Sequence, residues 1–414
     1  MKREKRRFVF LGVVLGTLML AACGTKTQDT PKKEPGDSTV LVPKASPATE
    51  AGEDGDGELP GPAVGDEAGQ PGTEDSEKKE SAVSPTPAVI VPEDIVDTSK
   101  EPYTYQEMCE DLELLAYAYP DIVSLTWPGT SADGRAIPAV LFGNPAAEQT
   151  VFIQAAIHGR EHLTTLLVME QLETYAKAYE SGSYDGVTYR DIFSEVALLV
   201  VPMSNPDGVS VSQLGTGAIR SEELRTQVEG FYERDGAGVT REYFYRRYKA
   251  NANGVDLNRN FAYGWEEYGG PDRPAADRYK GVAPGSEPET TLLMELTKSR
   301  NTAAALSYHA TGSVLYWDFG QSGALRERCL SFVETVHELT GYRIVYASSD
   351  KQDEAGYCEW AVGIEEIPEV TIEIGTVAAP LPISEFAGVW EKNKEVPVAV
   401  ACQVMREKDA GVCE

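Results

Sequence analysis

The stretch QAAIHGREHLTT, residues 154–165, decides how the rest of this sequence can fold. It closes an apolar run over residues 150–157, which stops at His158 and gives way to leucines at helical spacing. This pattern predicts a strand buried on both faces, a turn through Gly159, and a helix over residues 161–179.

His158 and Glu161 are three residues apart at this predicted turn. An imidazole offers a neutral nitrogen and a carboxylate offers charge, so such a pair can hold a divalent metal. An isolated histidine and glutamate at this spacing more commonly form a satisfied histidine and a solvated carboxylate. The choice between the two interpretations depends on residues further along the chain.

The remaining body alternates between strand-like apolar runs and segments of helical periodicity. Strands are predicted at residues 122–127, 137–142, 150–157, 196–201, 302–308, 314–317 and 367–374, and helices at residues 104–119, 161–179, 287–300, 325–339 and 384–405. Residues 202–208 are expected to form a turn-rich loop, and residues 213–262 a long, mostly irregular section. The alternation predicts a single α/β domain with a mixed, largely parallel central sheet covered by helices on both faces.

The first 23 residues have the features of a bacterial lipoprotein leader. Basic residues gather at positions 2–7, an apolar stretch covers residues 8–20, and Leu20-Ala21-Ala22-Cys23 resembles a lipobox. We therefore expect cleavage before Cys23, lipid modification of that cysteine, and attachment to the extracytoplasmic face of the cell membrane. The alternative is an ordinary signal peptide with an incidental cysteine.

Residues 24–98 are predicted to be a disordered acidic tether, and residues 99–414 a catalytic domain. The tether is rich in Pro, Gly, Ser, Thr and acidic residues and has no aromatic residue before the domain begins, so it cannot bury enough apolar surface to fold. The formal net charge of the chain is −29 at pH 7, which argues against nucleic acid as a partner. Anionic headgroups would also repel the chain, so the membrane anchor must be the lipid.

Six cysteines occur in the chain, and none has CxxC spacing, so a cysteine zinc site is not expected. Besides Cys23 they are Cys109, Cys329, Cys358, Cys402 and Cys413. The sequence leaves their disulfide pairing open.

Two of the four histidines end predicted strands. His158 ends the run described above, and His309, in SYHATG, follows the strand at residues 302–308. His337 lies within a predicted helix, where a structural role is expected. Glu373 stands in the apolar run TIEIG, where a buried charge is costly unless it is paired or functional. Functional side chains of α/β sheets lie at the carboxyl ends of strands, so these three residues are candidates for one site.

The segments IHGREH, NPDG, GVDLNRNF, SYHATG and TIEIG occur in this order along the chain. In content and order they resemble the zinc carboxypeptidase family, the metallocarboxypeptidases related to carboxypeptidase A, over about residues 103–405. The resemblance implies one Zn²⁺ held by His158, Glu161 and His309. It also implies that Glu373 is the general base that activates the zinc-bound water, and that Arg160 polarises the scissile carbonyl.

The resemblance assigns further roles to residues of the central segment. Asn258 and Arg259 would bind the terminal carboxylate of the substrate, a task that suits the guanidinium fork. Asp256 would orient His158, and Asn205 is expected to structure its loop. The family's oxyanion-stabilising arginine falls at Lys249 in the closest register. Arg246 and Arg247 are the alternatives for that role.

Two tyrosines of the animal enzymes have no clear counterpart. Ala310, Thr311 and Gly312 follow the second zinc histidine where those enzymes carry a tyrosine. The usual spacing of the mobile catalytic tyrosine before Glu373 leads to Lys351, with Tyr346 and Tyr357 only nearby. Proton donation by a tyrosine is therefore not expected.

Residues 158–162 also fit the HxxEH pattern, in which both histidines bind zinc from one helix and the glutamate is the base. That arrangement needs His158 and His162 one helical turn apart. Gly159 after a strong strand favours a turn instead.

Three hypotheses for the function remain open. The segments KANANGVDLNRNF and SYHATGSVLYW resemble bacterial family members that act on cell-wall peptides, including γ-D-glutamyl-diaminopimelate peptidases. Specificity in the family is set partly by a residue in the stretch that precedes the base. The candidate here is Cys358, which gives no charge to select a C-terminal Lys or Arg. We expect a monomeric, lipid-anchored peptidase for peptidoglycan stem peptides, of endo- or exopeptidase type. The alternatives are a general carboxypeptidase for scavenged peptides and a peptide-binding lipoprotein without catalysis.

Overall fold

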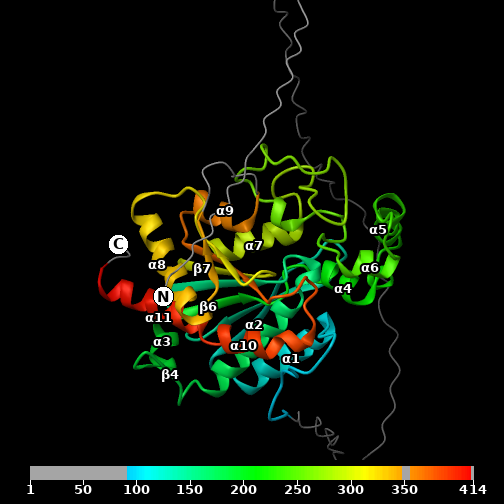
Figure 1. Cartoon of the computed structure of the whole chain (residues 1–414). Helices are drawn as coiled ribbons and strands as arrows, with labels where there is room; N and C mark the ends of the chain where they lie inside the picture. The colour runs from blue at the N-terminus through cyan, green and yellow to red at the C-terminus, as the bar shows by residue number, and fades with distance from the viewer. Residues whose placement is uncertain (1–90, 347–354, 412–414) are drawn as a thin grey trace, which may run out of the picture. The chain divides into compact units, whose positions relative to one another are not determined.

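The computed structural model describes residues 91–346 and 355–411 (Figure 1). The predicted signal peptide, the predicted lipidation site Cys23 and most of the predicted tether lie outside these residues, as do Lys351 and Cys413. The described residues belong to one compact unit. Of the cysteines within the described ranges, Cys109, Cys329 and Cys402 are free thiols. Among the described helices, none is both long and apolar enough to cross a bilayer.

An eight-stranded mixed sheet forms the centre of the fold. Its order is β1 (Val123–Thr130), β2 (Ala136–Phe142), β6 (Val196–Val201), β3 (Gln149–Ala155), β7 (Thr302–Ala310), β10 (Glu369–Ile374), β8 (Val314–Tyr316) and β9 (Arg343–Val345). The four central strands β6, β3, β7 and β10 are parallel, while β1, β2 and β8 pair antiparallel with their inner neighbours. The predicted mixed, largely parallel sheet is confirmed.

Apolar side chains cover both faces of the sheet, because alternate residues of a strand point to opposite faces. In β3, Val151 and Ile153 belong to one core and Phe152 to the other. The first core takes residues from α1 (Tyr105–Ala118), α2 (Leu163–Lys177), α8 (Gly323–Thr340), α10 (Phe386–Asn393) and α11 (Val396–Asp409). The second takes residues from α7 (Pro288–Lys298) and α9 (Tyr357–Gly363). Figure 1 shows α7 and α9 above the sheet and α2 and α10 below it.

The section predicted to be irregular contains helices, and the prediction was wrong there. α4 (Pro206–Leu214) begins inside the predicted loop, because Asn205 caps it by accepting the N–H of Gly208. α5 (Glu222–Asp235) and α6 (Arg241–Arg246) follow, capped by Ser221 and Thr240. These helices are rich in charged residues, so their apolar periodicity is weak, and only the Ser and Thr caps mark them in the sequence.

Two further boundaries also differ from the prediction. The closing helix predicted at residues 384–405 is divided into α10 and α11, and Pro397 lies in the first turn of α11, where a proline is tolerated. The short elements α3 (Tyr189–Glu195), α9, β9 and the ribbon of β4 (Ser183–Tyr184) and β5 (Val187–Thr188) were not predicted. Each is too short to give a clear period.

The packed body begins before residue 99, the predicted start of the domain. Ile95 and Val96 are buried in the first core, and the carboxylate of Glu173 accepts both of their backbone N–H groups at 2.7 and 2.8 Å. This segment therefore belongs to the domain, although its neighbours in the sequence have the composition of a linker.

Candidate metal centre and active site

His158 and Glu161 are presented by a sharp turn at the end of β3. Ala156 has a left-handed φ of 51°, and the short 3₁₀ turn η1 (Gly159–Glu161) precedes α2. A Cβ at residue 159 would lie 2.3 Å from the carbonyl carbon of Gly208, so only glycine allows η1 to pack this closely on α4. The helix predicted from residue 161 begins instead at Leu163.

A single carboxylate joins two histidines from different strands. Glu161 Oε1 lies 2.9 Å from His158 Nδ1, and its Oε2 lies 3.0 Å from His309 Nδ1 and accepts the N–H of Ala310 at 3.2 Å. All three side chains are buried, and one ligand atom from each lies within 4.8 Å of the others. Burial opposes ionisation of Glu161, but the two histidines outweigh burial and hold its pKa well below the usual range.

Asp256 fixes the orientation of the first histidine. Its Oδ1 lies 3.1 Å from His158 Nε2, and its Oδ2 accepts the N–H of Arg278. Burial disfavours the charged form of Asp256, yet the pKa of this carboxyl is lowered by His158, with contributions from Arg259 and Lys249. The contact agrees with the orienting role expected for Asp256.

The donor set of this cluster fits a zinc ion. A neutral imidazole carries one N–H, and in His158 the Asp256 carboxylate takes it at Nε2. The lone pair on Nδ1 then faces a carboxylate oxygen of Glu161, an arrangement that a cation between them stabilises. Two imidazoles and one carboxylate with a further position open are the donors of a catalytic zinc site.

His162 does not belong to this cluster. Among the described residues, the group able to hold a metal consists of His158, Glu161 and His309. The backbone of His158 is extended (φ −97°, ψ 129°) and not helical. The HxxEH alternative, which needs both histidines on one helix, is therefore excluded.

Glu373 lies beside the second histidine on the neighbouring strand. In the parallel ladder of β7 and β10, Glu373 is the register partner of His309, so both side chains project from the same face. Its Oε2 is buried and has no hydrogen-bond partner among the described residues. Burial, followed by the charge of Glu161, raises the pKa of Glu373 to about 7, against the opposing effect of His309, Lys249 and Arg160.

Lys249 is the cation that the central segment brings to the cluster. Its Nζ lies 3.9 Å from Glu161 Oε1. Arg247 instead donates to the carbonyl of Ala379, and Arg246 lines a separate cavity. The structure thus favours Lys249 over both alternatives. Arg160, in η1, has a buried Nε without a partner in the described part of the chain.

Asn258 and Arg259 follow Asp256 in the 3₁₀ turn η3 (Leu257–Arg259). Asn258 Oδ1 accepts the N–H of Tyr357 at 2.9 Å, which ties this turn to α9. Arg259 donates to the carbonyl of Asn258, and its guanidinium lies 5.4 Å from the ring centre of Tyr268. The chain therefore places both residues next to the side chain that holds His158.

Neither nearby tyrosine lies at the cluster. The hydroxyl of Tyr357 is buried and pairs with Thr297, and Tyr346 is exposed against the ring of Trp317. Lys351, the position that the family's usual spacing reaches, lies outside the described residues.

A buried polar network that was not predicted from the sequence supports these loops. Asn251 accepts the N–H groups of Asn253 and Val255 and donates to the carboxyls of Glu287 and Glu289. Burial, together with the charge of Asp207, raises the pKa of Glu289 to about 8. The asparagines of KANANG and the two glutamates on either side of Pro288 are visible in the sequence. Their spacing does not show that they form hydrogen bonds with one another.

Asn205 links three parts of the site. Its Nδ2 lies 3.0 to 3.1 Å from the carbonyls of Ile157, Lys249 and Ala250, and its Oδ1 accepts the N–H of Gly208. The side chain therefore connects the end of β3, the segment that carries Lys249, and the start of α4. This agrees with its expected role in loop structure.

Residues 108–396 match the family model described as zinc carboxypeptidase. The chain is 31% identical to a γ-D-glutamyl-L-diamino acid endopeptidase 1 of Lysinibacillus sphaericus over 70% of each chain, and 26% identical to a carboxypeptidase B of Astacus astacus over 53% of this chain and 64% of that one. The thrombin-activatable fibrinolysis inhibitor has the same fold, with a TM-score of 0.58, 17% identity, and coverage of 73% of this chain and 77% of that chain.

Substitution of Asp256 by asparagine should weaken zinc binding by about 10- to 100-fold, because Asp256 holds the ring of His158 and loss of such a partner has this effect. Titration with a zinc chelator of known affinity measures the change. An unchanged affinity of the Asp256→Asn variant would show that the contact does not orient the ligand.

The stability of the protein should fall as the pH rises from about 4.5 to 8, because Glu289 is protonated in the folded state below pH 8 but ionised when unfolded. Its contribution to the free energy of unfolding is present at low pH and lost through this window, at up to about 1.4 kcal/mol per pH unit. Urea unfolding of the metal-free Glu289→Gln variant should show a smaller slope. An identical slope would assign the pH dependence to other groups.

Proposed function

The chain is a member of the zinc carboxypeptidase family, and we propose that it hydrolyses a peptide bond in cell-wall stem peptides. The observation that carries the proposal is the buried cluster of His158, Glu161 and His309 beside Glu373, in a chain that is 31% identical to a γ-D-glutamyl-L-diamino acid endopeptidase. The family makes it a zinc-dependent hydrolase of peptides. The cell-wall substrate is the part that rests on the relative.

His158, Glu161 and His309 would hold one zinc ion. When bound, zinc polarises the scissile carbonyl and lowers the pKa of a water molecule. Asp256 keeps His158 in the tautomer with its proton on Nε2, so that the lone pair of Nδ1 can bind the metal.

Glu373 is the residue we assign to proton transfer. A carboxyl whose pKa is about 7 is partly ionised at neutral pH, so it can take a proton from the attacking water at Oε2 and give it to the leaving nitrogen. The rise in pKa comes first from burial, which also makes the ionised form a stronger base than a solvated glutamate.

Positive charges around Glu161 serve the oxyanion and the substrate's carboxylate. We assign Lys249 and Arg160 to the developing oxyanion, because Lys249 Nζ lies 3.9 Å from Glu161 and both charges act on Glu373. Asn258 and Arg259 are assigned to a terminal carboxylate of the substrate, because η3 offers a guanidinium and an amide next to Asp256.

The second candidate is a general carboxypeptidase for linear peptides. The similarity to carboxypeptidase B of Astacus astacus favours it, but it covers only 53% of this chain. Cys358, at the first turn of α9, supplies no charge that would select a basic C-terminal residue. The choice between the two candidates depends on the linkage of the substrate.

The proposal predicts that the zinc-loaded full chain cleaves a peptide with a γ-D-glutamyl–diamino acid bond but not an α-linked peptide of the same composition. Mass spectrometry of the products identifies the bond. The Glu373→Gln variant should lose about 10²- to 10⁴-fold in kcat while keeping its zinc, because only proton transfer is removed. Stepwise loss of residues from the α-linked peptide would favour the general carboxypeptidase, and no cleavage of either peptide would favour a binding lipoprotein.

We also propose that the enzyme is a monomer held by a lipid on Cys23 at the extracytoplasmic face of the membrane. The basic positions 2–7, the apolar residues 8–20 and the tetrapeptide ending in Cys23 support this anchor. Anionic lipid headgroups do not attract an acidic chain, so attachment to the membrane depends on the lipid.

The anchor predicts that the full chain produced in bacteria partitions into the detergent phase of Triton X-114, while its Cys23→Ser variant does not. Mass spectrometry of the mature N-terminus should find an acylated Cys23. Aqueous partition of the unchanged chain would contradict the anchor.

A further inference from the structure

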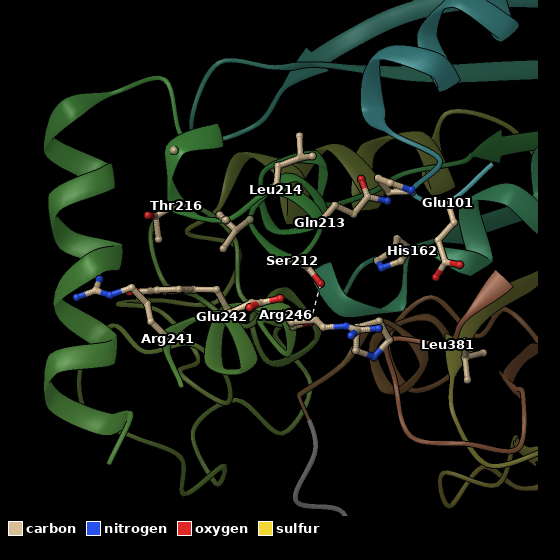
Figure 2. A pocket seen from close by; sticks show the side chains of 16 residues that line it. Glu101, His162, Ser212, Gln213, Leu214, Thr216, Arg241, Glu242, Arg246 and Leu381 are labelled. Carbon is tan, nitrogen blue, oxygen red and sulfur yellow. Dashed lines mark hydrogen bonds between the residues drawn. The ribbon is translucent and has the colours of Figure 1, made fainter. Parts of the chain in front are cut away.

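A cavity of about 640 Å³, lined in part by His162, the residue after the metal ligand Glu161, is not used by the proposed mechanism (Figure 2). Its walls come from the end of α4 with the loop that follows, from α6, and from residues 101–102 and 380–381. Neither the three metal ligands nor the pair Asn258 and Arg259 line it. It is therefore a separate compartment that shares only neighbouring chain segments with the catalytic residues.

Three parts of the cavity wall adjoin chain segments that carry catalytic residues. His162, which lines it, follows Glu161 in the chain. Arg246 ends α6 three residues before Lys249, and the next residue, Arg247, donates to the carbonyl of Ala379 just before the 380–381 wall. An extended peptide whose scissile bond lies at the cluster can therefore also occupy the cavity.

The cavity lies in a different direction from the residues assigned to the substrate's terminal carboxylate. Asn258 contacts α9, which Figure 1 shows above the sheet, while α4 and α6 lie at its right-hand end. Since Asn258 and Arg259 would bind the leaving side of the substrate, the cavity is placed to receive the acyl side.

Arg246 is an exposed arginine whose guanidinium has no hydrogen bond or ion pair with any described residue. The other two arginines of this segment are engaged. Arg241 pairs with Glu233 and stacks on Tyr232, and Arg247 donates to Ala379. Figure 2 shows Arg246 reaching into the cavity next to His162.

Two other side chains complete the polar wall. His162 lines the cavity beside Arg246. Gln213 donates to the carbonyl of Tyr103, while its Oε1 is buried without a partner within the described ranges. The wall therefore offers an unpaired cation and an amide oxygen that lacks a donor. Glu101 and Glu242 keep the cavity from being strongly basic overall.

We infer that this cavity binds the acyl side of the substrate and that Arg246 recognises a free carboxylate there. The inference rests on the proposed function, because a γ-linked glutamyl residue keeps its α-carboxylate free next to the scissile bond, whereas an α-linked residue does not. The guanidinium fork matches a carboxylate, and the Gln213 oxygen accepts a peptide N–H. Arg246 is thus a specificity-determining residue for the γ-linked substrate.

The test compares two synthetic peptides, alanyl-γ-D-glutamyl-L-lysine with a free α-carboxylate and the same peptide with an α-carboxamide. The zinc-loaded wild-type chain should prefer the free carboxylate. The Arg246→Gln variant should lose about tenfold in kcat/KM on the carboxylate peptide and little on the carboxamide. Arg343→Gln, on the outer strand β9, controls for the change in net charge and should leave both values unchanged.

Equal losses on both peptides, or no loss on either, would overturn the role of Arg246. Calorimetric titration of the full chain with the acyl-side dipeptide alanyl-D-glutamate and its α-carboxamide gives a second readout that needs no turnover. The wild type should bind the carboxylate form more tightly, and Arg246→Gln should remove the difference. If the wild type cleaves neither tripeptide, the proposed function fails, while the dipeptide titration still decides whether the cavity reads a carboxylate.

Discussion

One buried carboxylate, that of Glu161, faces two imidazoles at once, and the surrounding structure depends on this contact. Its two oxygens lie 2.9 and 3.0 Å from nitrogens of His158 and His309, which come from two neighbouring strands. A buried carboxylate is costly unless it is paired, so the ends of β3 and β7 must be held in register for the cluster to exist. The parallel ladders β3–β7–β10, packed between apolar cores on both faces, supply that rigidity.

The loops above the sheet are fixed by amide and carboxyl side chains more than by apolar packing. Asn205 binds three carbonyls of the segments that carry the ligands, and Asn251 joins the segment of Lys249 to Glu289 on α7. Such networks are stable only when each member is satisfied. Two of the buried atoms without a partner in the described structure, Glu373 Oε2 and Gln213 Oε1, are those to which we assign contacts with the attacking water and with the substrate.

The longer strands of the central sheet could be predicted from the sequence, because each is a short apolar run. The metal ligands followed from the resemblance of IHGREH and SYHATG to the motifs of the family. Lys249 could be identified by aligning its segment with the stretch that carries the family's oxyanion-stabilising arginine, and the structure places it next to Glu161. The helices α5 and α6 could not, because their charged residues leave little apolar period. The role proposed for Arg246 could not be predicted either, because the sequence does not show which of the three nearby arginines forms a hydrogen bond or ion pair. The first packed residues, Ile95 and Val96, depend on Glu173, which is distant in the sequence.

The central claim is that two imidazoles and one carboxylate from this chain bind zinc. X-ray absorption spectroscopy at the zinc edge, on the full chain loaded with one equivalent of zinc, tests it most directly. The account predicts scattering from two imidazole rings with nitrogen and oxygen as the nearest neighbours, and loss of one imidazole in the His309→Ala variant. Sulfur among the nearest neighbours, or an unchanged spectrum in that variant, would contradict it.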